Sequence, residues 1–552
     1  MPDFIRIVMP AWLLGAGLVG CASASLVLAP EAPDAPFKPA SASVPDGEVR
    51  PSSLPPTTTS GARDFGLPPM EGLPLVPPPP AIDPTHTYSL AELIDLAQIN
   101  NPETRTAWEH ARQAALAVGI AKALYLPVLS ATAVSGGQHD SGSSQGALGS
   151  LPVNNDLRGT VGSVALEWLI FDFGQRDALK RAATDLSFAS NVAFNGTHQK
   201  IIYDVSRAFY DYSSARQRVA IAAQSKTESA HLLDAAQDRR KQGIGTTVET
   251  AQAQQFLAQA AFNLVEARGA ERDSYHSLLA AVGISPLATL RIEDVSGRLL
   301  PANSMVPVEH IIAEAIARRP DIQASYAAAR ATRAAVTAVE ADFLPKVFVA
   351  ASDTYATGTL DITSLPSVPS LGSISTSLPS LPAPTPTTTS IPNLSSTLGN
   401  LSLNRTDTTV LAGVAVPLFD GGVRDARVRE ARSRTDAAES TVLRLEHAAA
   451  MEIVTADDAL RSSLEANRAA TVLVSASLTA YDAALAAYKS GAGTFTAALE
   501  AERALLSARL AKARAHGTAQ IAAASLAFST GRLSSSDVVD PQPIRTMGRQ
   551  KL

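Results

Sequence analysis

The chain of 552 residues carries a net charge of −6, a single cysteine and only 5% aromatic residues. The negative charge argues against a nucleic-acid partner, and a single cysteine excludes an intramolecular disulfide. Frequent alanine with few aromatic residues favours long, closely packed helices over one large globular core.

The first 21 residues predict an export signal that ends in a lipobox. Arg6 precedes an apolar stretch at 7–19, which is too short for a membrane span. The stretch closes on Leu18-Val19-Gly20-Cys21, a pattern typical of bacterial lipoproteins, in which the cysteine is acylated. We therefore expect a lipid on Cys21. Ordinary signal cleavage after Ala24 is the alternative.

Residues 22–87 are rich in Pro, Ser and Thr and predict a disordered linker. Ser89 and Glu92 then have the spacing of a capping box, which marks the start of helical structure.

From residue 88 onward the sequence contains an internal repeat, with two copies of one pattern. Leu93 and Pro102 recur as Ile311 and Pro320, at an offset of 218 residues. Further along the offset is 248, and the residues that recur at it are Phe171, Asp172, Gly174 and Arg176, matched by Phe419, Asp420, Gly422 and Arg424. The second copy therefore contains about 30 additional residues, which fall in an uncharged Ser/Thr/Pro/Leu-rich stretch. This predicts a loop insert at 358–406.

The two copies predict the same order of elements. The first repeat, 88–283, is expected to hold strands at 128–137 and 159–171, with a Ser/Gly-rich loop between them, and helices at 174–242 and 247–282. The second repeat, 306–531, is expected to hold strands at 346–356 and 408–419 and helices at 423–490 and 495–530. A connector at 284–305 joins the repeats, and a flexible tail is expected at 532–552.

Two periodicities support these elements. Apolar residues alternate with others along 162–170, as in a strand with one apolar face. A half-buried soluble sheet and a strand of an outer-membrane barrel would both show this alternation. Apolar residues of the following segment, from Ile202 to Tyr212, recur in steps of three and four, which is coiled-coil spacing. Four strands cannot close a barrel, so a barrel would need several chains, and periodicity does not choose between two and three.

At this point the chain resembles the TolC-type outer membrane efflux protein family, also called outer membrane factors. The matching motifs are Val416-Pro417-Leu418-Phe419-Asp420-Gly421-Gly422, Asn101-Pro102 and Tyr125-Leu126-Pro127, with their counterparts in the other copy. The resemblance covers 88–531. It implies a mainly helical fold in which long antiparallel coiled-coil hairpins form an α-barrel. This α-barrel would continue into a β-barrel of 12 strands, four from each chain of a homotrimer.

The same resemblance implies a passive exit duct in the Gram-negative outer membrane, extending into the periplasm. Its partners would be outer-membrane lipid, a periplasmic adaptor (membrane fusion) protein and an inner-membrane transporter. Two alternatives stay open: the outer-membrane component of type I protein secretion, and, from another class, a periplasmic coiled-coil adaptor or scaffold lipoprotein.

The resemblance also suggests residues that would close the periplasmic mouth of the channel. The resemblance places Glu249 at an acidic link position, Tyr488 at its partner and Glu500 on an acidic ring. Gly493 stands where an arginine link is expected and Ala497 where a second acid is expected. Alternatively, both glutamates are solvated acids near helix N-termini, which the helix dipole favours.

Glycine-rich turns separate the long helices of each copy. They contain Gly243 and Gly245 in the first repeat and Gly491 and Gly493 in the second. Either these glycines are helix breakers only, or the tips also dock the adaptor.

Sequence patterns of enzymes and cofactor sites are missing. Nine histidines are scattered without ligand spacing, and no second cysteine exists. There is no nucleophile turn and no phosphate loop. We therefore expect no enzymatic activity, no metal site and no cofactor.

Overall fold

The computed structural model describes residues 83–146, 149–300, 308–358 and 405–533. The chain divides into two units, Met1–Pro79 and Pro80–Leu552, and the described residues all belong to the second. The predicted signal peptide with Cys21, the linker up to residue 82, most of the loop insert and the tail beyond residue 533 lie outside the described residues.

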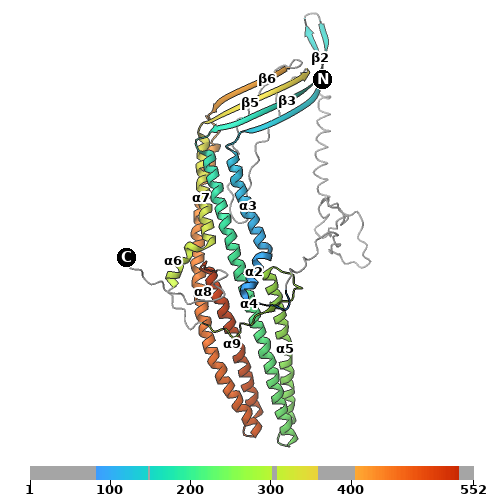
Figure 1. Ribbon diagram of the computed structural model, residues 1–552, viewed down its shortest axis with the longest axis vertical. Helices are drawn as coiled ribbons and strands as arrows, with labels where there is room; N and C mark the ends of the chain where they lie inside the picture. Colours follow the sequence, from blue (N-terminus) through green and yellow to red (C-terminus); the bar gives the residue numbers. More distant parts are fainter. Residues whose placement is uncertain (1–82, 147–148, 301–307, 359–404, 534–552) are drawn as a thin grey trace, which may run out of the picture. The chain divides into compact units, whose positions relative to one another are not determined.

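The described unit contains the same succession of elements twice (Figure 1). The first repeat comprises α2 (Leu90–Asn100), α3 (Pro102–Ala123), β2 (Val128–Gly146), β3 (Gly149–Phe171), α4 (Gln175–Lys241) and α5 (Thr247–Val282), and it is flanked by the short strands β1 (Thr87–Tyr88) and β4 (Arg291–Ile292). The second comprises α6 (Val308–Arg318), α7 (Pro320–Glu340), the 3-10 turn η1 (Ala341–Phe343), β5 (Lys346–Gly358), β6 (Arg405–Ala415), α8 (Val423–Ser490) and α9 (Phe495–Ser529). The predicted fold class is confirmed: long helix pairs with antiparallel strands, duplicated within one chain.

Local signals explain why helices α3 and α7 begin where they do. Both begin on a proline, whose missing N–H would have no helical partner at that position. Asn101 caps α3 by accepting a hydrogen bond from the Glu103 N–H at 2.9 Å. Arg319 holds the equivalent place before α7 and instead donates to the Ser529 carbonyl at 3.0 Å.

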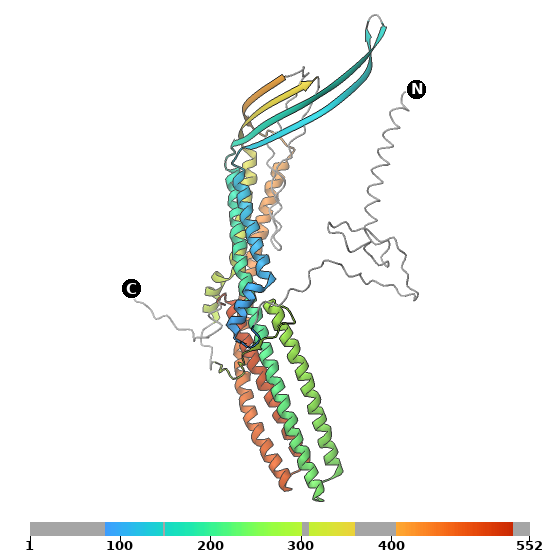
Figure 2. The same cartoon turned by 45° about the vertical axis from the view of Figure 1, so that its right-hand side comes forward.

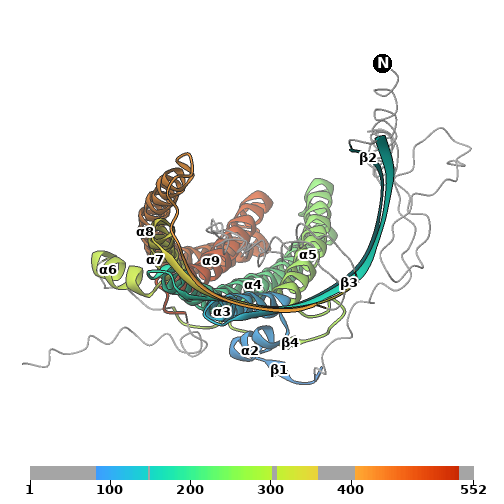
Figure 3. The ribbon, with the colours of Figure 1, turned by 90° about the horizontal axis from the view of Figure 1, so that it is seen from above.

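The four long strands form one antiparallel sheet in the order β2-β3-β5-β6, and they curve together (Figure 3). The predicted loop at 138–157 is wrong, because β2 continues to Gly146 and β3 starts at Gly149, with Gly146 and Gly149 in register. A ladder is built from backbone N–H and C=O groups, which glycine and serine supply without any apolar alternation. Composition therefore concealed the outer half of this hairpin.

Strand β6 is also displaced from its expected range of 408–419. It begins at Arg405, which pairs with Ala356, and ends at Ala415. Pro417 has no N–H to contribute to a ladder, so the residues leading to Phe419 leave the sheet.

The register gives the sheet two chemically different faces. One cross-strand row consists of Leu129, Leu166, Ala351 and Val410, and the adjacent row, on the opposite face, consists of Ser130, Ala165, Ser352 and Thr409. Side chains paired across strands share a face. The sheet therefore presents an apolar face and a more polar one, and Leu129 and Val410 are each 70% exposed in the single chain.

The helices lie side by side in two successive layers that start at the sheet (Figures 1 and 2). Next to the sheet, the packing order is α3-α4-α7-α8, and beyond it the order is α5-α4-α9-α8. The α4–α5 and α8–α9 turns lie together at the end away from the sheet (Figure 2). Each repeat thus contributes one long hairpin, and α4 and α9 make the contact between the two hairpins.

A single apolar core joins the layers where α2, α4, α5 and the segment after α5 meet. Its fully buried members include Leu93, Val205, Phe209 and Leu279. The last residues of the predicted linker and the first residues of the predicted tail belong to this region and are ordered. The predicted linker is ordered from Asp83 on, since β1 pairs in parallel with β4 of the connector. The first tail residues are also ordered, and Leu533 is buried in the core.

Helix α8 stands out by its exposed apolar surface. Among the described residues it is the one helix long and apolar enough to cross a membrane by length and composition. Only 17% of its most apolar 18-residue window is buried in the single chain. A helix that covers its apolar side with another protein chain has the same composition, so this property alone does not distinguish lipid from protein as its neighbour.

Candidate functional site at the hairpin tips and the strand–helix junctions

The two strand–helix junctions share one capping device, built from Asp-x-Gly-x-Arg. The carboxylate of Asp172 accepts hydrogen bonds from the N–H groups of Gly174 and Arg176 and from Arg176 Nε, at 2.9 to 3.3 Å. Asp420 accepts the corresponding bonds from Gly422 and Arg424 at 2.9 to 3.0 Å. The aspartate therefore caps the following helix in both copies.

Glycine is required at the turn of each junction. Gly174 and Gly422 have φ angles of 91° and 87°, a left-handed conformation that side chains with a Cβ disfavour. Because both glycines precede the first helical residue and carry no capping group, the aspartate two residues earlier supplies the cap instead.

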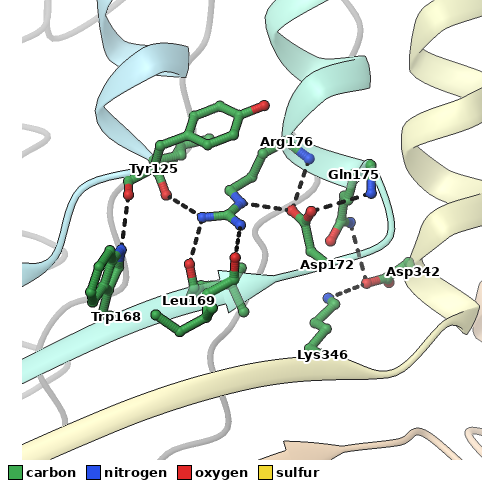
Figure 4. Close-up of polar contacts among 11 residues, drawn as sticks. Tyr125, Trp168, Leu169, Asp172, Gln175, Arg176, Asp342 and Lys346 are labelled. Atoms are coloured by element: carbon green, nitrogen blue, oxygen red, sulfur yellow. Dashed lines mark hydrogen bonds and ion pairs between the residues drawn. The ribbon is translucent and has the colours of Figure 1, made fainter.

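The first junction is tied together by the Arg176 guanidinium, which is 6% exposed (Figure 4). It donates to the carbonyls of Leu169, Ile170 and Leu124 at 2.6, 3.1 and 3.2 Å, and it stacks on the Tyr125 ring at 4.7 Å. One side chain thus connects the end of β3, the start of α4 and the end of α3.

A second polar cluster at this level joins the first repeat to the second (Figure 4). Asp342 at the end of α7 accepts from Lys346 Nζ at 2.6 Å and from Gln175 Nε2 at 3.4 Å, and Arg424 Nε lies 3.5 Å from its other oxygen. Burial by itself would raise the pKa of Asp342, but Lys346, Arg424 and Gln175 together hold that pKa below its ordinary value.

Trp168 completes the junction on the apolar face of the sheet. Its indole Nε1 donates to the Tyr125 carbonyl at 2.9 Å, and its ring is 40% exposed (Figure 4). Phe171 and Phe173, at the end of β3 and just after it, are similarly half exposed and meet edge-on. An exposed aromatic group whose polar atom is satisfied by the protein suits a boundary between lipid and water.

The hairpin tips reverse the chain through left-handed glycines. Gly243 and Gly491 have φ angles of 79° and 84°. A Cβ on Gly245 would approach the Arg240 backbone nitrogen to 2.8 Å, and one on Gly493 would lie 3.0 Å from the Ala487 Cβ. The tips therefore need glycine for close approach as well as for backbone conformation.

The two turns differ in how the helix that follows is capped, because α5 has Glu249 where α9 has Ala497. Thr246 and Glu249 form a complete capping box, with hydrogen bonds of 3.1 and 3.2 Å. Thr494 caps α9 through the Ala497 N–H at 3.2 Å, but alanine cannot return a bond. Glu249 is thus a helix cap, a role that neither of the two interpretations of the sequence included.

Tyr488 lies at the centre of a cluster that joins the two hairpins next to their tips, and it is 1% exposed. The cluster consists of Leu232, Ala235, Ala236, Ala253, Tyr488, Phe495 and Ala498. Phe495 meets the Tyr488 ring edge-on at 5.7 Å. Burial and then the charge of Glu249 raise the pKa of Tyr488. Its hydroxyl makes no hydrogen bond of normal geometry within the described part of the chain.

Arg239 is the residue at the tips that sequence reasoning missed. From the last turn of α4 its Nη1 donates to the Tyr488 carbonyl at 2.8 Å, and its Cζ lies 4.9 Å from the centre of the Tyr488 ring. Gly493 carries no side chain for the expected link, and the arginine that contacts Tyr488 comes from the other hairpin. Three consecutive basic residues end α4, and nothing in the sequence showed which of them turns toward α8.

The remaining expected gate residue, Glu500, is exposed on α9 and lies outside this cluster. The structure thus brings Glu249 close to Tyr488 and leaves Glu500 apart from both. Across residues 83–146, 149–300, 308–358 and 405–533, no group of three or more His, Cys, Asp or Glu could hold a metal ion.

The geometry agrees with what comparison with known proteins shows. The family model described as outer membrane efflux protein matches the chain twice, over residues 93–284 and 311–532. These two segments contain both long hairpins and all four strands of the large sheet. The chain belongs to the outer membrane efflux protein family. The family is a family of channels and not of enzymes, so the scaffold-lipoprotein alternative is wrong and this efflux protein functions in the outer membrane with a periplasmic extension.

Individual relatives are distant from this efflux protein. Protein CyaE of Bordetella pertussis is 28% identical over 281 residues, which are 49% of this chain and 55% of CyaE. The chain therefore matches only about half of that relative's length. Outer membrane protein OprJ of Pseudomonas aeruginosa is 24% identical over 75% of this chain and 78% of OprJ. The Campylobacter jejuni CmeC outer membrane channel has the same fold, with a TM-score of 0.63 and 17% identity over 82% of this chain and 88% of CmeC.

Proposed function

We propose that this efflux protein is the passive exit duct of a tripartite export system, formed by three copies of the chain. Three sheets of four strands would close a 12-stranded β-barrel in the outer membrane, and the helices would form an α-barrel through the periplasm. Substrate would come from an inner-membrane transporter through a periplasmic adaptor protein.

The observation that carries this proposal is that every layer of the described unit has two unpartnered edges. In the sheet, β2 and β6 each pair on one side only, and lipid does not tolerate open strand edges. In the helical layers α3, α5 and α8 are outermost. Large exposed apolar side chains on these helices include Leu116 and Ile120 on α3, Phe262 and Val265 on α5, and Leu443, Met451, Val472 and Leu473 on α8.

A neighbouring copy would satisfy all three sets of edges at once. Strand β6 would pair with β2 of the next chain, and α8 would pack against α3 near the sheet and α5 near the tips. The apolar face of the sheet, with Leu129 and Val410, would then contact lipid, and the exposed aromatics beside Trp168 would lie at the membrane boundary. The more polar face would line the lumen.

At the other end, we propose that the tips close the periplasmic mouth and dock the adaptor. Tyr488 holds the hairpins together through Arg239, and Glu249 lies close to it. Glu500 would contribute charge to the mouth because it is exposed there. The turns around Gly243 and Gly491 would be the docking points, since they end the hairpins.

The membrane role can be tested with two neighbouring positions on β6. Val410→Arg places a charge on the apolar face, where it should cost about 2–4 kcal/mol if the site is near the bilayer midplane and less toward an interface. Thr409→Arg places the same charge on the opposite face and should be tolerated, with an altered ion selectivity. The readouts are the amount of heat-modifiable trimer in outer-membrane fractions and the conductance of purified trimer in planar bilayers.

The same measurements define which results would contradict the proposal. Equal trimer levels for both variants would contradict a lipid-facing row at Val410. Absence of a trimer and of pores in the unmodified protein would contradict the duct itself. Transport of dyes or of a secreted protein in a strain lacking the native channel would separate small-molecule efflux from type I secretion.

A further inference from the structure

A buried carboxyl lies at the contact between the two hairpins, close to the tips. Glu502 is on α9, two turns after the start of this helix, and is only 1% exposed. Its Oε1 accepts a hydrogen bond from the Ser229 hydroxyl of α4 at 2.6 Å. Its Oε2 is buried and has no hydrogen-bond partner among the described residues.

Within the described part of the chain, no ion pair neutralises this carboxyl. The charged groups that act on it are Glu228 on α4 and Arg503 on α9, with Ser225 and Ser229 of α4 as polar neighbours. Tyr481 on α8 is also close to it, and Asp482 and Arg509 in turn act on Tyr481. Arg509 Nη1 contacts both oxygens of Glu228 at 2.8 Å, so its charge is already paired. The Arg503 guanidinium lies over the Phe256 ring at 4.7 Å.

These surroundings shift the ionisation equilibrium of Glu502 toward the protonated acid. Burial is the main cause that raises the pKa of Glu502 above its ordinary value, and the nearby charge of Glu228 adds to it. The Ser229 hydroxyl and Arg503 act in the opposite direction without cancelling the effect of burial. An ionised Glu502 would be a buried charge with an unsatisfied oxygen, which is costly.

The position of Glu502 connects this preference to the tips. The packing of α9 along α4 is the main contact between the hairpin of the second repeat and that of the first, and the Arg239–Tyr488 contact adds to it at the tips. One turn closer to the tips, Ala498 belongs to the apolar cluster around Tyr488. Separating α9 from α4 would expose Glu502 to water and restore its ordinary behaviour.

We propose that Glu502 is a proton-operated latch between the hairpins. With the carboxyl protonated, α9 packs against α4; when the carboxyl ionises, this contact loosens and the tips separate more readily. The effect on the packing is independent of transport, whereas its effect on opening a mouth rests on the proposed duct function.

The direction of the pH effect follows from linkage. Because the pKa of Glu502 is higher in the packed state than in the separated state, the packed state binds the proton more tightly. Packing is therefore most favoured below the ordinary pKa of the acid, and this advantage is lost as the pH rises through the raised value. Within that window each pH unit changes the ratio of packed to separated hairpins at most tenfold.

The test compares the purified full-length protein with Glu502→Gln, which is nearly isosteric and cannot ionise. Glu465→Gln serves as the control, since it removes an exposed carboxylate from α8. Hydrogen exchange of the amides at 495–505, normalised to the intrinsic rate at each pH, reports the packing between pH 4 and pH 8. Single-channel recording over the same range reports the opening.

We expect protection in the unmodified protein and in Glu465→Gln to fall with rising pH, and protection in Glu502→Gln to stay at the low-pH level. Channel opening should follow the same pattern. A pH dependence retained in Glu502→Gln, or absent from the unmodified protein, would overturn the latch. Intact exchange behaviour without any conductance would support the latch and count against the duct.

A second variant keeps the test informative if Glu502→Gln does not assemble. Ser229→Ala removes the hydrogen bond of 2.6 Å that Oε1 accepts, and this bond favours the ionised form. The loss of protection should then shift to higher pH, since ionisation becomes harder. A shift to lower pH, or none, would refute the assignment of the pH dependence to Glu502.

Discussion

The strand–helix junction offers a direct test of how the four-stranded sheet is held to the helices. Arg176→Met keeps much of the side chain's length but removes the guanidinium that contacts Asp172 and three backbone carbonyls. The ion pair is buried, with both side chains at most 7% exposed. Removing one member of a buried pair leaves an uncompensated charge and costs about 3–5 kcal/mol.

Two features determine how much of that cost should appear. Asp172 keeps its bonds from the backbone N–H groups of Gly174 and Arg176 in the variant, which limits the loss. The freed carbonyls of Leu169 and Ile170 add to the loss, because each buried group without a partner costs about 1–3 kcal/mol. These contributions share one side chain and are not additive, so we expect a total near the buried-pair value.

Arg424→Met is the matched control, because it occupies the same place in the second repeat. Its ion pair with Asp420 is about one quarter exposed on each side, and its second contact, with Asp342, is longer at 3.5 Å. A pair of that exposure contributes at most about 1 kcal/mol. The temperature at which the detergent-purified trimer dissociates should therefore fall much further in Arg176→Met than in Arg424→Met. Equal shifts in the two variants would refute the claim that burial of the first junction matters.

Three other changes test separate parts of the molecule. Arg239→Ala should loosen the tips and raise the open-channel conductance, whereas Arg240→Ala, an exposed neighbour, should not; equal conductances would contradict the role of Arg239. The pKa of Asp342 is lowered in the folded state, so its stabilisation is complete above the ordinary value of 3.8 and is lost as the pH falls through the lowered one. Trimer dissociation should consequently become easier in acid, and Asp342→Asn should remove that part of the pH dependence, as thermal scans at several pH values would show. Cys21→Ser should abolish metabolic labelling with a radioactive fatty acid, and unchanged labelling would exclude a lipid on Cys21.

Sequence reasoning worked best where the signal lies within a few neighbouring residues. The turn at Gly243 to Glu249 contains a glycine that ends one helix and a capping box that starts the next, so the helix expected at 247–282 corresponds to α5. The Asp-Gly pairs at the two junctions likewise mark where α4 and α8 begin. The constant offset between the copies then showed that both hairpins have the same length.

Sequence reasoning misplaced the strand ends, because where a strand ends depends on pairing with its neighbour. The outer half of the β2–β3 hairpin has no apolar alternation, and its strands exist because backbone groups in register can pair. The end of β6 was misplaced because apolar alternation continues past Pro417, while the ladder needs an N–H that proline lacks. Periodicity reports which faces are apolar and not where hydrogen bonding stops.

By itself, the sequence determined the duplication, the helical hairpins, the glycine turns and the family, because these depend on local spacing that a single chain displays. Only the tertiary structure decided which side chains meet across the hairpins. Arg239 and Tyr488 are 249 residues apart, and Ser229 and Glu502 are 273 apart. Glu500 and Glu502 are alike in type and two positions apart, yet the first is exposed and the second buried. That difference depends on which side of α9 packs against α4, and local sequence does not specify the rotation of one helix against another.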